Sequence, residues 1–287
     1  ERGGFETFML KEIFEQPTAL ADTLTERTTY RGEVVLPELA LRDDQIRSLR
    51  QIVIVACGTS YHAGLLAKYA LERWARVPVE VDVASEFRYR DPVLSDETLC
   101  IAVSQSGETA DTLAAMRMAG KAGCRVLAVT NVVGSQATRE ADAVLYTRAG
   151  LEIGVAATKT LITQLLVMLL LAVHFGRVRN TLGRREAAEI VDELRRAPGL
   201  LAGYLHGDAP AAVARLAPAY SDSPFFLYVG RGVGVPVCYE GALKLKEIAY
   251  IPTEAYAAGE MKHGPIALLT EGSPVVVVAA DSRTYEK

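Results

Sequence analysis

Short apolar runs alternate with segments of helical spacing along the first half of the chain. The run Ile52–Ala56 is continuous and rich in β-branched residues, which is typical of a strand buried on both faces. Further strands are predicted at Val79–Val83, Leu99–Val103, Arg125–Val129 and Ala143–Tyr146, and helices at Tyr61–Arg76, Ala110–Ala122 and Glu152–Phe175. This alternation predicts an α/β fold, with a parallel sheet covered by helices on both faces.

The pattern restarts in the second half of the chain. Residues 176–222 are helical and charge-rich and are predicted to form a connector. The new copy has a buried strand, a glycine turn, a helix and a second strand, at Phe225–Val229, Gly230–Gly232, Pro236–Tyr250 and Pro274–Val278. The large offset between the copies indicates a duplicated domain rather than a solenoid. The second copy is expected to be incomplete, because so few strands leave a sheet under-covered.

The N-terminal segment lies outside this repeating pattern. Phe8–Leu24 has helical spacing interrupted by Pro17, which indicates either an arm packed on the following domain or a plain N-terminal helix. The predicted division is an arm over residues 1–45, a first domain over 46–205 and a partial second domain over 206–287. The chain starts at Glu1 rather than Met and has no signal-peptide pattern, so it is expected to be part of a longer protein.

Composition narrows the function classes. Half of the 287 residues are apolar, the net charge is −4 and there is no basic cluster, which argues against nucleic-acid or membrane-surface binding. The apolar run Leu165–Val173 is too short to span a bilayer and indicates a buried helix. Cysteines 57, 100, 124 and 238 are far apart without metal-site spacing, which predicts reduced thiols in a cytoplasmic protein and no metal.

The segment Ser104–Thr109 has the pattern of a phosphate site. It follows a predicted buried strand and begins a predicted helix, whose first N–H groups have no partner within the helix. Ser104, Ser106 and Thr109 can add hydroxyl donors beside Gln105, and Gly107 allows close approach of an anion. The alternative is that Ser106 or Thr109 only caps the helix. Three hydroxyls, a glutamine and a glycine in one turn favour a ligand.

The second half carries candidate proton-transfer groups. Glu240, Lys244 and Glu247 have the i, i+4, i+7 spacing that places them on one helix face. Such a row is either a surface ion-pair ladder or, with His263 in the glycine-bracketed segment 259–264, a set of groups for proton transfer on a sugar. The segment 150–159 at the start of a long helix is either a capped helix start or part of the site wall, through its backbone N–H groups and Thr158.

Taken together, these motifs resemble the isomerase half of the glucosamine-6-phosphate synthases, which contains two sugar-isomerase (SIS) domains. The resemblance covers nearly the whole chain and rests on the segments Cys57–Tyr61, Ser104–Thr109, Glu152–Val155, Glu240–Glu247 and Glu260–Pro265. It implies two SIS-type units, each a parallel sheet between helices, with the second unit incomplete. It also implies the substrate fructose 6-phosphate, the product glucosamine 6-phosphate, no cofactor, a homodimer and a glutaminase domain upstream.

The resemblance assigns roles to individual residues. Ser104, Gln105, Ser106 and Thr109 would hold the phosphate, with the segment Cys57, Gly58, Thr59 and Ser60 lining the same pocket. Val155 would contact the sugar through its backbone. Glu247, helped by Lys244, would move a proton between C1 and C2, and His263 would open the ring in the partner subunit's site.

Three departures from the family pattern limit this assignment. Ala157, a candidate substrate contact, stands where the family usually has serine. The chain holds no glutaminase segment, and it ends before the family's C-terminal lysine, which forms a Schiff base with the ketose. We therefore expect the chain to bind fructose 6-phosphate, to form no glucosamine 6-phosphate, and to associate through its second sheet.

Two other functions fit part of this pattern. A non-catalytic SIS sensor of sugar phosphates would leave Glu247 and His263 without a purpose, and no DNA-binding module precedes the domains. A fructosamine-6-phosphate deglycase has the same double SIS layout. The segment Phe8–Pro17 argues against the deglycase, because it resembles the link that follows a glutaminase domain.

Overall fold

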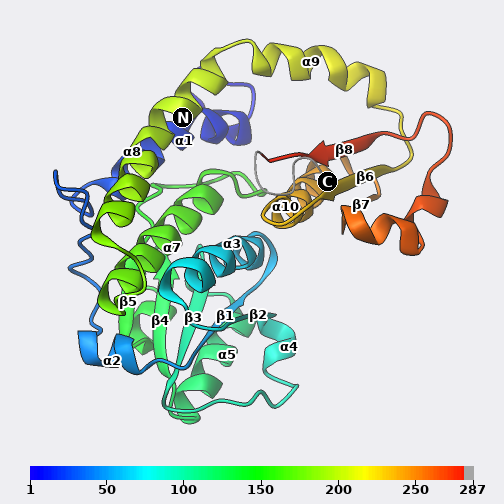
Figure 1. Ribbon diagram of the computed structural model, residues 1–287. Helices are drawn as coiled ribbons and strands as arrows, with labels where there is room; N and C mark the ends of the chain where they lie inside the picture. The colour runs from blue at the N-terminus through cyan, green and yellow to red at the C-terminus, as the bar shows by residue number, and fades with distance from the viewer. Residues whose placement is uncertain (281–287) are drawn as a thin grey trace. The chain divides into compact units, whose positions relative to one another are not determined.

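The chain forms two compact units in a computed structural model that describes residues 1–280 (Figure 1). The first unit contains residues 1–202 and the second begins at residue 203, so the division falls within helix α8 (Arg184–His206). The expectation that the chain ends before the family's C-terminal lysine concerns residues 281–287, which lie outside the described part.

The first unit contains a parallel sheet with the strand order β2-β1-β3-β4-β5. Its five strands confirm the predicted ones, with ends that shift by at most one residue: β1 (Gln51–Ala56), β2 (Val79–Val83), β3 (Thr98–Ser104), β4 (Arg125–Thr130) and β5 (Ala143–Tyr146). The chain moves from β1 outward to β2 and then returns to β3 on the other side of β1. The carboxyl ends of β1 and β3 therefore flank the point where the strand order reverses, which is where open α/β sheets bind ligands.

Helices cover both faces of this sheet, as predicted. Alternate residues of β1 point to opposite faces, so Ile52 and Ile54 join one apolar core while Val53 and Val55 join another. Helices α1 (Phe8–Leu24), α3 (Gly58–Ala70) and α7 (Lys159–Val178) pack on the first face, and α4 (Ala84–Phe87) and α5 (Ala110–Lys121) pack on the second (Figure 1). Shorter helical segments are α2 (Asp43–Ser48), a π-helical turn (Leu71–Ala75) and α6 (Gln136–Glu140).

Helix α1 continues through Pro17, where the sequence pattern indicates an interruption. Proline removes the N–H that would bond to the carbonyl four residues earlier, that of Ile13. The side chain of Gln16 replaces it, because its Nε2 donates to the Ile13 oxygen at 3.0 Å. This local substitute allows the helix to continue to Leu24.

A buried arginine, paired with a glutamate of the same segment, joins the segment after α1 to the sheet. Arg27 has no exposed side-chain surface, and it donates from Nε to Glu38 Oε1 at 3.1 Å and from Nη2 to the Tyr146 carbonyl, at the end of β5, at 2.6 Å. Burial acts against ionisation of Glu38, but the hydrogen bond and charge of Arg27 outweigh it and lower the pKa of Glu38. The N-terminal 45 residues are therefore an integral part of the first unit.

Glu38→Gln is expected to lower the free energy of unfolding by about 3 kcal/mol at pH 7, because it leaves the buried Arg27 without its charge partner. Since the folded-state pKa of Glu38 is lowered, its contribution is present above the unfolded pKa of about 4.3 and disappears as pH falls through the folded value. Urea unfolding at pH 7 and in acid measures this difference. Glu33→Gln, in the exposed pair with Arg184, is the control; equal midpoints for the two variants at pH 7 would refute the prediction.

Helix α7 begins at Lys159, seven residues later than the predicted start at Glu152. The carboxylate of Glu152 accepts hydrogen bonds from the N–H of Thr158 at 2.8 Å and of Thr160 at 3.4 Å, so residues 152–158 form a loop that folds back onto the helix start. The helix is long and apolar enough to cross a membrane by composition alone. However, 61% of that window is buried, and it packs in the core of the first unit, as predicted for Leu165–Val173.

The second unit contains a parallel sheet with the order β7-β6-β8 among its described residues. Strands β6 (Phe226–Gly230) and β8 (Val275–Val278) confirm the predicted repeat, and α10 (Gly234–Ala249) packs on the sheet. Strand β7 (Thr253–Ala257) was not predicted. Helix α9 (Ala209–Tyr220) precedes β6, and two short 3₁₀ turns, Ala258–His263 and Pro265–Leu268, follow β7.

Candidate functional site

Two of the predicted site segments lie at the carboxyl ends of neighbouring strands. Cys57–Ser60 follows β1 and begins α3, and Ser104–Thr109 follows β3 and precedes α5. Strands β1 and β3 pair directly, with Val55 opposite Ala102. Both segments therefore leave the sheet at the switch point identified above, on the same edge.

Hydroxyl groups organise the turn Ser104–Thr109. The N–H of Gly107 donates to Ser104 Oγ at 3.1 Å, the N–H of Glu108 donates to Ser106 Oγ at 3.1 Å, and Ser104 Oγ lies 3.0 Å from Thr109 Oγ1. A hydroxyl can donate one hydrogen bond and accept two. Ser106 uses its oxygen as an acceptor in this turn, so its O–H remains able to donate to an anion.

The side chain of Thr109 does not cap α5, which was the alternative role for this turn. Thr109 occupies the N-cap position of α5, but among residues 1–280 it receives no capping hydrogen bond from the helix N–H groups. The carboxylate of Glu108 accepts instead from the N–H of Gln136, at 2.7 Å, and so points away from the start of α5. The first turn of α5 thus keeps N–H groups and partial positive charge available for a ligand.

Position 107 requires a glycine both because of its backbone conformation and because neighbouring atoms leave no room for a Cβ. It has a φ of +66°, and a Cβ at this position would lie 2.1 Å from Ser135 Oγ. Its carbonyl accepts from the N–H of Ala137 at 3.0 Å. Ser135 is a residue that sequence analysis missed: its hydroxyl is buried beside the turn and has no hydrogen-bond partner within residues 1–280.

The segment Cys57–Ser60 receives support from the buried face of α7. Gln164, 1% exposed, donates from Nε2 to Ser60 Oγ at 3.0 Å, which leaves the Ser60 O–H able to donate elsewhere. Gly58 begins α3 with a φ of +54°, and Cys57 and Thr59 are half-buried. Gln164 was not predicted as a site residue, because its position in an apolar helix indicates only a core residue.

The loop 149–158 follows β5 and brings Val155 and Ala157 to the same strand-end edge of the first unit. Val155 is 98% exposed and Ala157 is half-buried. Asn131, immediately after β4, accepts from the N–H of Ala149 at 2.8 Å and donates to the Gly150 carbonyl at 2.7 Å. Asn131 was also missed, although an asparagine directly after a buried strand is a signal that sequence could have supplied.

In the second unit, Lys244 lies between two carboxylates on α10. Its Nζ is 3.4 Å from Glu240 and forms a close ion pair with Glu247, so the predicted row on one helix face is present. The side chains become more exposed along the row, from 9% at Glu240 to 34% at Glu247. His263 is exposed at the end of a 3₁₀ turn and precedes Gly264. The geometry allows both an ion-pair ladder and a lysine-supported proton carrier.

Comparisons with known proteins identify the family. The SIS domain family matches residues 45–174 and 220–287. Glutamine–fructose-6-phosphate aminotransferase [isomerizing] from Methanosarcina acetivorans is 51% identical over 288 residues, covering 100% of this chain and 46% of the relative. The protein of the same name from Mycolicibacterium smegmatis is 55% identical, covering 97% of this chain and 44% of the relative.

A solved structure agrees with these relatives over the whole chain. The C-terminal domain of glucosamine-fructose-6-phosphate aminotransferase from Francisella tularensis has a TM-score of 0.95 and 40% identity, covering 100% of this chain and 80% of that one. The chain spans less than half the length of the curated relatives it matches. It belongs to the SIS-domain family and, within it, to the C-terminal isomerase part of the glutamine–fructose-6-phosphate aminotransferases.

Proposed function

We propose that this chain is the sugar-binding and isomerising part of a cytoplasmic enzyme that converts fructose 6-phosphate and glutamine-derived ammonia into glucosamine 6-phosphate. The observation that carries the proposal is the hydroxyl-rich turn Ser104–Thr109 at the switch point of a parallel sheet, in front of the N-terminus of α5, which its N-cap residue Thr109 does not cap. The names of the relatives supply the substrate and the reaction.

The proposed chemistry joins an anchored phosphate to a proton transfer. Ser104, Gln105, Ser106 and Thr109 hold the phosphate, with Cys57–Ser60 beside them, so that the sugar carbons are presented in one orientation. Ammonia condenses with the C2 carbonyl to give an imine and water, and Glu247 then carries a proton from C1 to C2 to complete the aldose. Lys244 forms an ion pair with Glu247 and so orients its carboxylate for that step.

The proposal extends to assembly. His263 opens the sugar ring in the site of a second copy, in a symmetric dimer whose two equivalent loops are exchanged by a twofold axis. Its exposure at the end of a 3₁₀ turn is compatible with contact to another subunit. A glutaminase domain on the same polypeptide supplies the ammonia, in keeping with the names and the greater length of the relatives.

Calorimetric titration of the 287-residue chain tests the phosphate anchor. We expect fructose 6-phosphate to bind at least about 100-fold more tightly than fructose, because two or more hydrogen bonds to a charged group are lost without the phosphate. Glucose 6-phosphate serves as a control for the sugar part, since it carries the same phosphate. Equal affinities for fructose and fructose 6-phosphate would remove the basis of the proposed function.

A further inference from the structure

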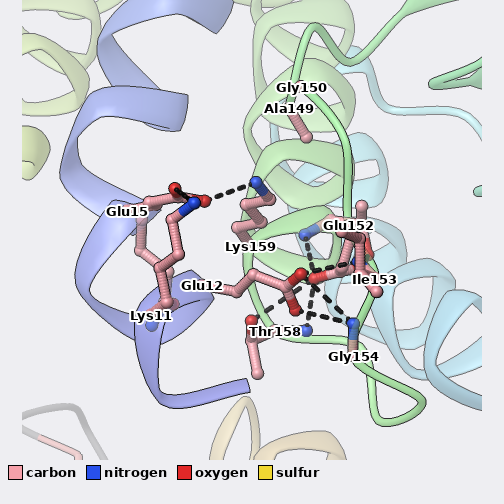
Figure 2. Close-up of polar contacts among 12 residues, drawn as sticks. Lys11, Glu12, Glu15, Ala149, Gly150, Glu152, Ile153, Gly154, Thr158 and Lys159 are labelled. Atoms are coloured by element: carbon pink, nitrogen blue, oxygen red, sulfur yellow. Dashed lines mark hydrogen bonds and ion pairs between the residues drawn. The ribbon is translucent and has the colours of Figure 1, made fainter. Parts of the chain in front are cut away.

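Glu12 on helix α1 holds the backbone of a loop that is distant in the sequence. Its side chain is buried, with the residue 2% exposed, and its carboxylate accepts hydrogen bonds from the N–H of Ile153 at 2.6 Å and of Gly154 at 3.1 Å (Figure 2). Hydrogen bonds from N–H groups to a carboxylate are about twice as strong as those between neutral groups. Because this buried carboxylate accepts hydrogen bonds from two main-chain N–H groups, it fixes the position of that backbone.

The loop 149–158 is held at three places, and Glu12 provides the middle one. Asn131 holds its beginning at Ala149 and Gly150, and Glu152 closes its end onto Thr158 and Thr160 at the start of α7. Between α1 and the loop lies a cavity of about 570 Å³, lined by Glu12, Lys159 and Gly150 among others. Close packing is therefore limited along this boundary, and the polar contacts of Glu12 determine where Ile153 and Gly154 lie.

Gly154 is matched to this carboxylate. A Cβ at position 154 would lie 2.6 Å from Glu12 Oε2 and 3.4 Å from the Met9 Cα, so a side chain there would displace the carboxylate from the backbone. Glu12 and Gly154 therefore depend on each other for a single contact, that of the carboxylate with the backbone N–H. Glu12→Gln would weaken this contact by removing the charge, and Gly154→Ala would weaken it by displacing the carboxylate.

Helix α1 has attachments that do not involve Glu12. Thr23 Oγ1 donates to the Thr147 carbonyl at 2.6 Å. Figure 2 shows a second attachment, in which Lys159 Nζ lies 2.7 Å from Glu15. Beyond the helix, Arg27 donates to the Tyr146 carbonyl. The loss of Glu12 therefore leaves α1 attached and affects the loop locally.

We propose that Glu12 is a positioning residue for the sugar site: its carboxylate sets the Ile153–Gly154 backbone and thereby presents the exposed main chain of Val155 to the sugar. This inference rests on the proposed function and on the role that the family resemblance implies for Val155, contact with the sugar through its backbone. The phosphate turn Ser104–Thr109 makes its own contacts with Thr130, Gln136 and Ala137, so it does not depend on Glu12. Glu12 should influence recognition of the sugar and leave recognition of the phosphate unchanged.

The test compares Glu12→Gln, Gly154→Ala and the double variant with the parent 287-residue chain, using Asp22→Asn as an exposed carboxylate control on the same helix. Fructose 6-phosphate and inorganic phosphate are titrated by calorimetry, and amide hydrogen exchange is followed at Ile153 and Gly154. Each single variant is expected to bind fructose 6-phosphate about tenfold more weakly and inorganic phosphate within about twofold of the parent. Exchange at the two amides should accelerate by about tenfold, and the double variant should be no weaker than the weaker single variant.

Three results would overturn the inference. Unchanged affinity of Glu12→Gln for fructose 6-phosphate, in a parent that binds it, shows that Glu12 does not position the site. Equal losses for fructose 6-phosphate and inorganic phosphate indicate general damage rather than positioning, and additive losses in the double variant show that Glu12 and Gly154 act separately. A parent that binds no fructose 6-phosphate is a different result, because it contradicts the proposed function itself.

Discussion

The combined change Ser106→Ala and Thr109→Val should weaken binding of fructose 6-phosphate by about 100- to 10,000-fold. Each hydroxyl is expected to donate to a charged phosphate oxygen, and the loss of one such bond costs about 1.5–3 kcal/mol. Valine preserves the shape of threonine, so the helix start is left in place. Thr109 also lies 3.0 Å from Ser104, whose hydroxyl loses its neighbour in the variant. Calorimetric titration measures the change.

A matched variant separates this effect from a general loss of surface hydroxyls. Ser48→Ala with Thr25→Val removes one serine and one threonine hydroxyl that bond to nearby backbone carbonyls at other helix ends. That variant should bind fructose 6-phosphate like the parent. If the Ser106 and Thr109 variant also binds like the parent, the turn Ser104–Thr109 is a structural turn and not a phosphate site.

Glu247→Gln should slow exchange of the sugar's C1 and C2 hydrogens by about 100- to 10,000-fold, the usual contribution of a positioned general acid or base. Glutamine keeps the size of the side chain but cannot accept the proton. Affinity for fructose 6-phosphate should stay within a few-fold, because the proposed phosphate anchor, Ser104–Thr109, consists of other residues. The measurement is deuterium exchange followed by NMR, in a full-length protein that contains this chain.

The control is Glu240→Gln, because Glu240 is the other carboxylate beside Lys244. If the row on α10 is only an ion-pair ladder, the two variants should have equal exchange rates. If Glu247 carries the proton, Glu240→Gln should keep most of the exchange and Glu247→Gln should not. Equal rates would therefore assign Glu247 to the ladder alone.

The fold of the first unit could be predicted because its signals are local. Runs such as Ile52–Ala56 are continuous, β-branched and bounded by turn residues, so strand, turn and helix follow from neighbouring positions. Strand β7 was missed because Thr253–Ala257 contains no valine or isoleucine and has two alanines and a glutamate, residues that are uncommon in strands. It becomes a strand by pairing with β6.

The geometry of the turn Ser104–Thr109 was predictable for the same reason, since its hydroxyls, glycine and helix start lie within six consecutive residues. The contacts that other parts of the chain make with the predicted site segments could not be predicted. Ser135 meets Gly107, and Gln164 meets Ser60, across chain separations that a local pattern does not describe. The predicted start of α7 failed similarly, because the apolar spacing continued through a segment where Glu152 and Glu12 take the backbone N–H groups.

The most direct test of the central claim is a crystal structure of the chain grown with fructose 6-phosphate. We expect the phosphate group within hydrogen-bond distance of Ser104, Ser106 and Thr109, in front of the first turn of α5, with the sugar extending toward Val155. A phosphate bound at any other place, with this turn empty at saturating ligand, would contradict the account.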